Sequence, residues 1–172
     1  MFVRVFMLFG GAVLAKEKGK STTVLVEQLV EPVLRQMGFT VWDVRYEKEG
    51  PDYFLRILID KNDGYMDMNA CEEATRAINP VIDEADPIDG SYYLEVGSPG
   101  LGRKLTRPQH FEMLKGQEVT AHLIRPENGL RDITGTLCGG GDEICIEADG
   151  QMYRLAKNTV SYVKLNDDKD LF

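Results

Sequence analysis

The segment from residue 94 to residue 105, LEVGSPGLGRKL, places a predicted strand directly before a rigid turn and a basic stretch. Apolar and polar residues alternate at its start, which predicts the strand. Pro99 fixes its own backbone φ angle and restricts Ser98 before it, so the turn cannot be a loose tether. These features predict a joint between two domains over residues 98–110, in which Ser98, Pro99 and Gly100 set the angle between the domains.

This joint is also a sustained break in the acidity of the chain. The sequence has 20 Lys and Arg against 28 Asp and Glu, a net charge of -8. No acid occurs between Glu95 and Glu112, whereas four basic or titratable residues fall there: Arg103, Lys104, Arg107 and His110. We therefore expect a polyanion to meet the protein at this stretch.

Charge is divided unevenly between the segments. Residues 1–22 hold four bases and one acid, residues 23–97 hold six bases and sixteen acids, and residues 98–172 hold ten bases and eleven acids. The middle segment, at a net charge of -10, favours a basic partner. A solvated acidic face that only aids solubility is the alternative interpretation. Candidate contacts to a basic partner, all expected on polar faces, are Asp43, Glu47, Glu72 and Glu73.

Residues 23–97 are typical of a small α/β domain. Thr23 is a candidate N-cap, and a helical face ending at Gly38 follows it: Val26, Val30, Val33 and Met37. Pro32 lies inside this helix and predicts a kink. Two alternating runs joined by turn residues 49–52 predict a hairpin. The apolar residues of these runs are Trp42, Val44, Tyr46, Leu55, Ile57 and Ile59.

A second helix and a third strand complete this domain. Asn69 and Glu72 have the spacing of a capping box. The apolar face that follows is made of Cys71, Thr75, Ile78 and Ile82. Pro80 predicts a kink or an early end of the helix. With a strand over residues 92–96 the order becomes α-β-β-α-β, which two helices on one face of a sheet satisfy.

Residues 111–165 predict a small β-barrel of five strands. Alternating runs occur at residues 118–123, 133–137, 143–148, 152–155 and 160–165, with turn signals between them. This density is typical of an SH3-like or Sm-like barrel. Candidate contacts to an anion are Arg125, Arg131, Arg154 and Lys157, for which scattered solvated charges are the alternative interpretation. Residues 166–172 form an acidic tail.

Residues 1–22 precede these patterns, and we interpret them as an extension or an upstream start. The apolar run from Val5 to Ala15 also resembles the h-region and cleavage site of a secretory signal, which is the alternative. The run is too short to span a bilayer. Only Arg4 would supply the basic n-region of such a signal.

Sites of catalysis or metal binding are not indicated. Three cysteines without a Cys-x-x-Cys pair, and two histidines twelve residues apart, lack the spacing of a zinc site. The odd cysteine count favours a reducing compartment. The triple glycine at residues 139–141 lacks the following Lys-Ser/Thr of a phosphate loop, so we interpret it as a flexible hairpin tip. We expect no metal, no cofactor and no enzymatic activity.

Several fragments follow one another in a familiar order. They are Met37-Gly38-Phe39, Val41-Trp42-Asp43-Val44, the strand at residues 55–60, Cys71-Glu72-Glu73, and Ser98-Pro99-Gly100-Leu101 with Arg103, Leu105, Phe111 and Gly116 after it. In this order they resemble the ribosome maturation factor RimP family, from about Thr23 to about Leu165. Family members commonly carry Ser, Asp and Pro where this chain has Gly97, Gly102 and Lys104.

The resemblance implies an N-terminal KH-like domain, an SH3-like or Sm-like barrel, and a non-catalytic role in the cytoplasm. It implies a monomer without membrane attachment that binds the immature small (30S) ribosomal subunit and aids its maturation. The implied partners are 16S rRNA in that subunit and one basic small-subunit protein, the twelfth in the usual series. Two alternatives stay open: a free-standing Sm-like RNA-binding module with an oligomerisation domain, and an exported envelope protein.

Overall fold

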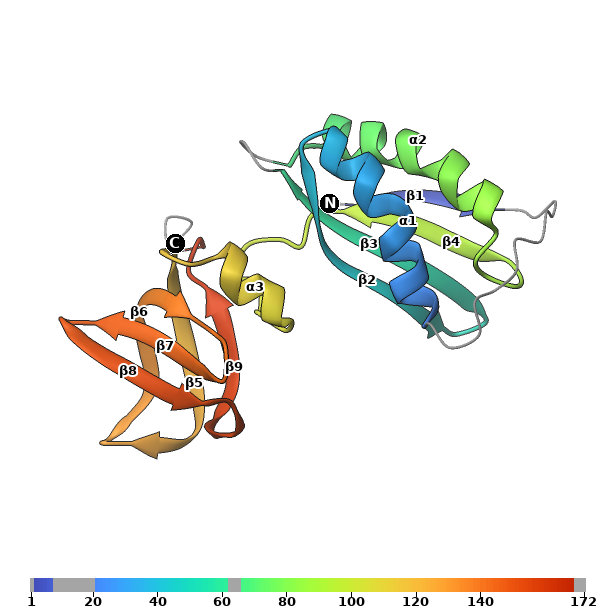
Figure 1. Cartoon of the computed structure of the whole chain (residues 1–172). Coiled ribbons are helices and arrows are strands. Elements are labelled where there is room, and N and C mark those ends of the chain that lie inside the picture. Colours follow the sequence, from blue (N-terminus) through green and yellow to red (C-terminus); the bar gives the residue numbers. More distant parts are fainter. Residues whose placement is uncertain (1, 8–20, 62–65, 169–172) are drawn as a thin grey trace. The chain divides into compact units, whose positions relative to one another are not determined.

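The computed structural model describes residues 2–7, 21–61 and 66–168, and of residues 2–7 it describes only the backbone. The chain divides into two compact units, Met1–Pro99 and Gly100–Phe172 (Figure 1). Each unit has its own sheet and its own hydrophobic core. The predicted boundaries of the joint (residues 98–110), the barrel (residues 111–165) and the tail (residues 166–172) stay predictions.

The first unit is an α+β fold in which two helices cover one face of a four-stranded sheet (Figure 1). The sheet order is β1-β4-β3-β2, in which β3 and β4 run parallel and the other neighbours antiparallel. The predicted order helix-strand-strand-helix is confirmed. The elements are β1 (Phe2–Met7), α1 (Thr22–Gln36), β2 (Phe39–Glu49), β3 (Asp52–Lys61), α2 (Met68–Ala85) and β4 (Tyr92–Gly97).

Strand β1 is an element that the sequence analysis did not assign. It pairs with β4 along its whole length, from Phe2 opposite Gly97 to Met7 opposite Tyr92. The candidate targeting run from Val5 to Ala15 overlaps β1 at its start, and its other residues lie outside the described part of the chain. A targeting role for that run stays a prediction.

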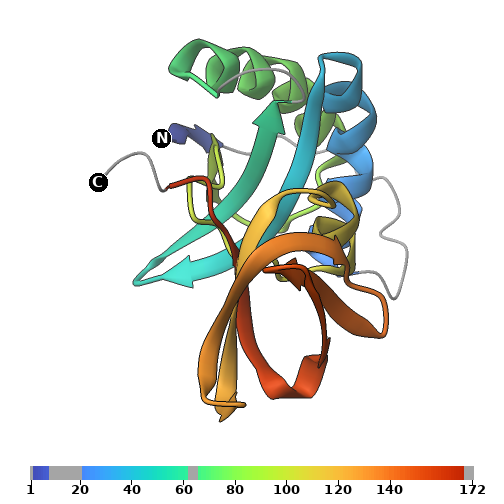
Figure 2. The ribbon, with the colours of Figure 1, turned by 90° about the vertical axis from the view of Figure 1, so that its left-hand side faces the viewer.

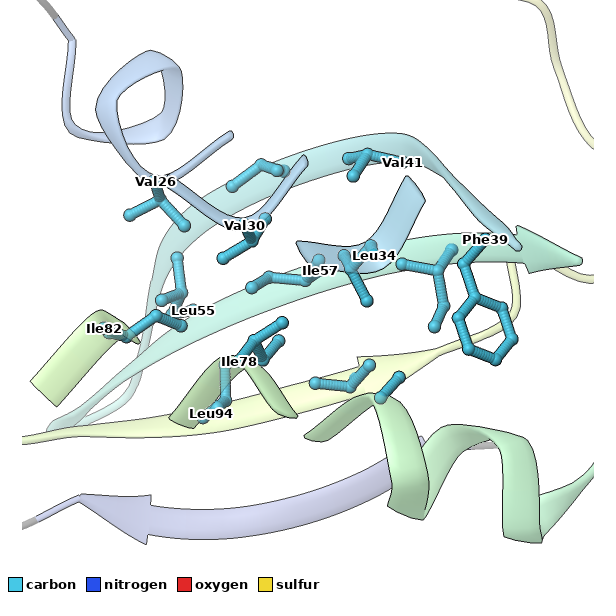
Figure 3. Close-up of a cluster of buried hydrophobic side chains, with 14 of the residues drawn as sticks. Val26, Val30, Leu34, Phe39, Val41, Leu55, Ile57, Ile78, Ile82 and Leu94 are labelled. Carbon is cyan, nitrogen blue, oxygen red and sulfur yellow. The ribbon is translucent and has the colours of Figure 1, made fainter. Parts of the chain in front are cut away.

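Helix α1 packs on the sheet through three fully buried residues, Val26, Val30 and Leu34 (Figure 3). Val33 is partly buried against the same core, as predicted. Met37 is 37% exposed, so its prediction as a core residue is wrong. The reason is that the helix ends at Gln36 and Met37 is its C-cap, where the helical period no longer applies.

Helix α2 begins two residues before the predicted capping box. Asp67 is the N-cap, and its Oδ1 accepts a hydrogen bond of 2.7 Å from the backbone N–H of Ala70. The predicted box starting at Asn69 is therefore wrong. The predicted apolar face is confirmed, since Cys71, Thr75, Ile78 and Ile82 are all buried. The helix continues through Pro80, so the predicted early end is wrong too.

The hairpin of β2 and β3 turns where predicted, with Glu49 opposite Asp52. A bulge between Val41 and Asp43 interrupts the alternation of β2. Val41 and Val44 belong to the core beneath the helices, whereas Trp42 is buried outside that cluster. The prediction that Trp42 shares a face with Val44 is wrong, because a bulge adds one residue and changes which side the next side chains take.

The second unit is a curved, five-stranded antiparallel sheet in the order β8-β7-β6-β5-β9 with a short helix before it (Figure 2). All five predicted strands are confirmed, and inward-facing residues from each of them form the core with Leu105 and Phe111. The elements are α3 (Pro108–Met113), β5 (Glu118–Glu127), β6 (Leu130–Gly139), β7 (Glu143–Ala148), β8 (Gln151–Ala156), the 3-10 helix η1 (Lys157–Thr159) and β9 (Val160–Leu165).

Closure of this sheet into a barrel is not confirmed, because its edge strands β8 and β9 do not pair with each other within the described residues. Two hairpin turns lie where predicted, and in each an Asn or Asp precedes a glycine. Asn128 and Gly129 have φ angles of 50° and 79°, and Asp149 and Gly150 have 51° and 75°. Such positive angles at both central residues suit tight hairpins between twisted strands.

Candidate functional site

Arg103 and Lys104, two of the predicted RNA contacts, lie on an extended segment beside β9. The backbone N–H of Leu105 donates to the carbonyl of Val163 over 2.8 Å, and the N–H of Leu165 donates to the carbonyl of Arg103 over 2.9 Å. These two hydrogen bonds follow the pattern of a short antiparallel pairing. The first part of the basic stretch is therefore fixed to the sheet of the second unit.

The side chain of Lys104 lies over the ring of Tyr162 in β9, with Nζ 4.5 Å from the ring centroid. The ring of His122 in β5 stacks on the same tyrosine, with 5.0 Å between centroids and 11° between planes. A stacked ring and a cation cannot share one face, so Tyr162 is held between the two. Nδ1 of His122 lies 2.6 Å from Oδ1 of Asp132, which continues the row onto β6. Sequence reasoning identified Lys104 and missed the other three residues.

Carboxylates of the predicted acidic tail meet this segment. Oδ1 of Asp167 accepts a hydrogen bond of 2.7 Å from the backbone N–H of Gly102, and Oδ2 lies 3.6 Å from Nη2 of Arg103. Oδ2 of Asp168 lies 3.5 Å from Nζ of Lys164. The described part of the tail thus offsets some of the positive charge beside β9. Residues 169–172 of the tail lie outside the described chain.

Arg107 and Lys157 line one hollow of about 290 Å³ in the second unit. Its floor is apolar and includes core side chains, among them Leu105, Phe111 and Ile144. The lining residues, all within the described chain, include no Asp or Glu. The hollow therefore combines an apolar floor with two cations, which the linear sequence places 50 residues apart.

His110 fixes the loop that carries Arg107. The imidazole is fully buried, and its Nδ1 accepts hydrogen bonds from the backbone N–H groups of Thr106 at 3.1 Å and Arg107 at 3.3 Å. A nitrogen that accepts from two amides carries no proton, so the ring holds the loop as a buried acceptor. Because it is fully buried, His110 is not available to a polyanion, although it lies in the stretch without acids.

Gly140 supports the floor of the hollow. It is buried against Phe111, so closely that a Cβ at this position would lie 2.3 Å from Cγ of the ring. Gly141 has no atom within 4 Å of an added Cβ. Gly139 is the last residue of β6, and the other two glycines lie between β6 and β7. Gly140 belongs to the packed interior, so the prediction of a flexible tip is wrong for this residue.

The other predicted cations lie elsewhere on the second unit. Arg125 and Arg131 are exposed near the end of the β5–β6 hairpin, beside Ile124 and Leu130, which are 53% and 45% exposed. Arg154 is exposed on β8. The structure therefore brings Arg107 together with Lys157 but does not gather all seven predicted cations at one place.

In the first unit, Glu47 belongs to a cluster organised by Arg56 on the sheet face opposite the helices. The guanidinium of Arg56 donates from Nε to Glu95 over 2.7 Å, and from Nη1 to Glu47 over 2.8 Å and to Glu49 over 2.7 Å. The hydrogen bonds that Arg56 donates to Glu49 and to Glu95 raise the pKa of its guanidinium above the ordinary value. The guanidinium of Arg56 thus orients three carboxylates, and these four residues are called here the Arg56 cluster.

Asp43 does not project from a polar face. Its side chain is 11% exposed, its Oδ1 accepts from the backbone N–H of Val44 over 3.0 Å, and its Oδ2 accepts from Nε of Arg45 over 2.7 Å. The expected exposure of Asp43 is therefore wrong, because the bulge in β2 turns this carboxylate into the structure. The two hydrogen bonds indicate that Asp43 stabilises the conformation of β2.

Glu72 and Glu73 lie on α2, on the helical side of the sheet and away from the Arg56 cluster. Oε2 of Glu72 pairs with Nη2 of Arg76 over 3.1 Å, one helical turn along. Glu73 is exposed. The four predicted acidic contacts therefore do not form one site, since one is buried and the others lie on two sides of the sheet.

Other chemistry within the described residues is sparse. No group of three or more His, Cys, Asp or Glu there could hold a metal ion. No helix of the described chain is long and apolar enough to cross a membrane. Cys71 is buried in α2, as predicted, and desolvation by that burial raises the pKa of its thiol. A buried thiol of this kind behaves as a small apolar residue.

Part of this chain matches the model of a known protein family. Residues 29–102 match the family model of the RimP N-terminal domain. The matched stretch runs from the second half of α1 to the start of the basic stretch, so it contains the Arg56 cluster and the predicted joint at residues 98–100.

Proposed function

Because this chain belongs to the RimP family of ribosome maturation factors, we propose that it binds the immature small (30S) ribosomal subunit and promotes the maturation of that subunit without catalysing a reaction. The partners in this proposal are the 16S rRNA and the basic small-subunit protein that is twelfth in the usual series. The protein acts as a monomer in the cytoplasm.

The observation that carries this proposal is the different charge of the two units. Residues 23–97 have a net charge of -10, and the Arg56 cluster holds three of their carboxylates in fixed positions. Fixed carboxylates lose little freedom when a cation meets them, so they suit a basic protein. The same charge opposes close contact with RNA phosphates.

The second unit supplies the surface for RNA. Its cations include Arg107 and Lys157 around a hollow without acids, and Arg125 and Arg131 at an exposed hairpin. Its curved sheet supports the proposal of an SH3-like or Sm-like barrel, a small fold that binds through shallow grooves and loops. Arg103, Lys104 and Arg154 are further contacts in this proposal.

We propose that the first unit has a KH-like fold but does not bind RNA in the way that KH domains do. KH domains grip the nucleic-acid backbone with a Gly-x-x-Gly loop. The sequence Gly97-Ser98-Pro99-Gly100 has that spacing, but it follows β4 and does not join two helices. We assign it to the joint, where Pro99 and a Gly100 with a φ of 80° define a turn.

Sedimentation of a cell lysate through a gradient at low salt tests the proposed function. The full chain should travel with free small subunits and be absent from complete ribosomes, because a maturation factor leaves once the finished subunit no longer offers its surface. Raising the salt should release it, since charge supplies much of the attraction.

A variant with Glu47→Gln and Glu49→Gln keeps Arg56 paired with Glu95 and removes two charges of the Arg56 cluster. It should bind free subunits less tightly than a control in which Glu143 and Glu147, on β7 of the other unit, become Gln. A full chain that sediments alone, or as a ring of copies, would contradict the proposed function.

A further inference from the structure

The hollow beside α3 has an apolar floor and two cations, Arg107 and Lys157, among its lining residues. We infer that it binds one unpaired nucleotide of RNA, with the base against the apolar floor and the phosphate at Arg107 and Lys157. This inference deepens the proposed function and rests on it, because it names the form of RNA that the second unit takes.

The size of the hollow limits what can enter. A volume of about 290 Å³ lies just below the roughly 300–1,000 Å³ that small-molecule sites span. It has room for one base and too little for a larger ligand. Phe111, Val160 and Ile144 supply apolar surface, and Thr106 and Ser161 place hydroxyl groups at its border. A base needs both kinds of contact, apolar on its faces and polar at its edge.

The position of Tyr162 directs the base to the floor. Tyr162 borders the hollow, but its two ring faces are already taken by Lys104 and His122. A base therefore does not stack on this tyrosine and meets Phe111 and Val160 instead. The Lys104 ammonium over the ring stays near the border, where it adds to the positive potential.

A second hollow shows why the charge matters. It has a volume of about 460 Å³ and is lined by residues 124–127 at the end of β5 and by Asn158 and Thr159 of η1. There Glu127 accompanies Arg125, and no aromatic residue lines it. An acid beside the cation opposes a phosphate, so this larger space suits a nucleotide less well than the hollow of Arg107 and Lys157.

The occupant is an unpaired strand and not a duplex, because a paired base cannot leave its stack to enter a hollow without a cost in unpairing. A basic protein is the wrong partner for this hollow, since Arg107 and Lys157 would repel it. Sequence-specific readers of RNA commonly take unpaired bases in this way, whereas duplex contacts go mainly to phosphates and sugars.

The test fills the hollow without removing a charge. Ser161 is exposed at its border on β9, so the full-length Ser161→Phe variant should place a ring there. Thr136→Phe, on the exposed face of β6 and outside the hollow, is the matched control. Both variants are compared with the unchanged chain for binding to a single-stranded RNA of about ten nucleotides and to the same strand in a duplex.

Ser161→Phe should weaken binding to the single strand by about tenfold and leave duplex binding unchanged, whereas Thr136→Phe should change neither. Arg107→Gln with Lys157→Gln should lower the salt slope for the single strand by about 1.4, and Lys115→Gln outside the hollow should have no such effect. Circular dichroism confirms that each variant is folded.

Equal binding of the single strand by Ser161→Phe and the unchanged chain would overturn the inference. Equal losses of affinity for the single strand and for the duplex would also overturn it. So would a loss of affinity for the isolated basic protein alone. If Ser161→Phe leaves RNA binding unchanged while the unchanged chain still sediments with free small subunits, the inference about the hollow is wrong and the proposed function stands.

Discussion

Arg56 of β3 and Glu95 of β4 are register partners in parallel strands, and Nε of Arg56 donates to Oε2 of Glu95 over 2.7 Å. Both side chains are largely buried, at 20% and 12% exposure. Glu47 and Glu49 complete the coordination of the same guanidinium from β2. The guanidinium of Arg56 therefore ties β2, β3 and β4 together on the sheet face opposite the helices and fixes the direction of these carboxylates.

Replacing Arg56 by Met should destabilise the first unit by about 2 kcal/mol, because the largely buried Glu95 loses the hydrogen bond from Arg56 and three neighbouring carboxylates lose a shared cation. Trp42, the sole tryptophan of the chain, lies in this unit, so urea unfolding followed by tryptophan fluorescence reports on it. Arg76→Met is the control: its pair with Glu72 is exposed, and its loss should cost less than about 0.5 kcal/mol. Equal losses of unfolding free energy in the two variants would show that Arg56 has no special structural role.

Substitutions at Asp43 and at Glu47 should have different effects, the first on stability and the second on association with the partner. Asp43→Ala should lower the free energy of unfolding by about 1–2 kcal/mol, because it leaves the N–H of Val44 and the guanidinium of Arg45 without this acceptor. Glu47→Gln should leave stability nearly unchanged and slow association with the isolated basic partner, a difference that shrinks as salt is raised. Stopped-flow association rates and urea unfolding on both variants check this. The reverse assignment of effects would place Asp43 at the interface after all.

The acidic tail should compete with RNA. Asp167→Asn with Asp168→Asn removes the carboxylates that meet the backbone N–H of Gly102 and the side chains of Arg103 and Lys164. Lys164, the more exposed of these two cations, then becomes more available to phosphates. Binding to single-stranded RNA at low salt should strengthen by about two- to tenfold, in line with the small worth of each surface ion pair. Asp149→Asn, in the β7–β8 turn, is a control for the loss of negative charge alone. If that control gains as much affinity for RNA per charge removed, the net charge of the protein and not the position of the tail explains the effect.

Gly140 and Gly141 form a matched pair of neighbours. Gly140→Ala forces a Cβ into the ring of Phe111 and should destabilise the second unit by about 1–3 kcal/mol, whereas Gly141→Ala meets open space and should be nearly neutral. Hydrogen exchange of the backbone amides of β6 and β7 measures the stability of this unit in the full chain. Equal protection in the two variants would show that Phe111 moves aside at no cost.

Much of the fold follows from periodicity in the sequence. The face of α2 was predicted from its spacing, and the five strands of the second unit were predicted from alternation and turn residues. Trp42 was misplaced because one extra residue in a strand is invisible to a pattern of period two. Strand β1 was missed because its pairing with β4 spans some 90 residues, and a short apolar run does not identify its partner.

The candidate site was less predictable, for a related reason. Arg56 and Glu95 are 39 residues apart, and only the parallel pairing of β3 with β4 makes them neighbours. Arg107 and Lys157 meet at one hollow because η1 and the loop before α3 lie side by side there. The sequence shows which residues are charged, but not that Asp43 turns inward or that His110 is an internal acceptor. Those outcomes depend on tertiary contacts that no local pattern encodes.

The central claim is that the two units divide their partners, protein to the first and RNA to the second. Residues 1–99 contain a complete core and the strand β1 that pairs with β4, so this fragment should fold alone.

The most direct measurement compares the equilibrium binding of residues 1–99 with that of the full chain, each to the isolated basic ribosomal protein and to naked 16S rRNA, over a range of salt. We predict that the fragment keeps most of the affinity for the protein and loses most of the affinity for the RNA. Tighter binding of the fragment to naked rRNA than to the basic protein would contradict it.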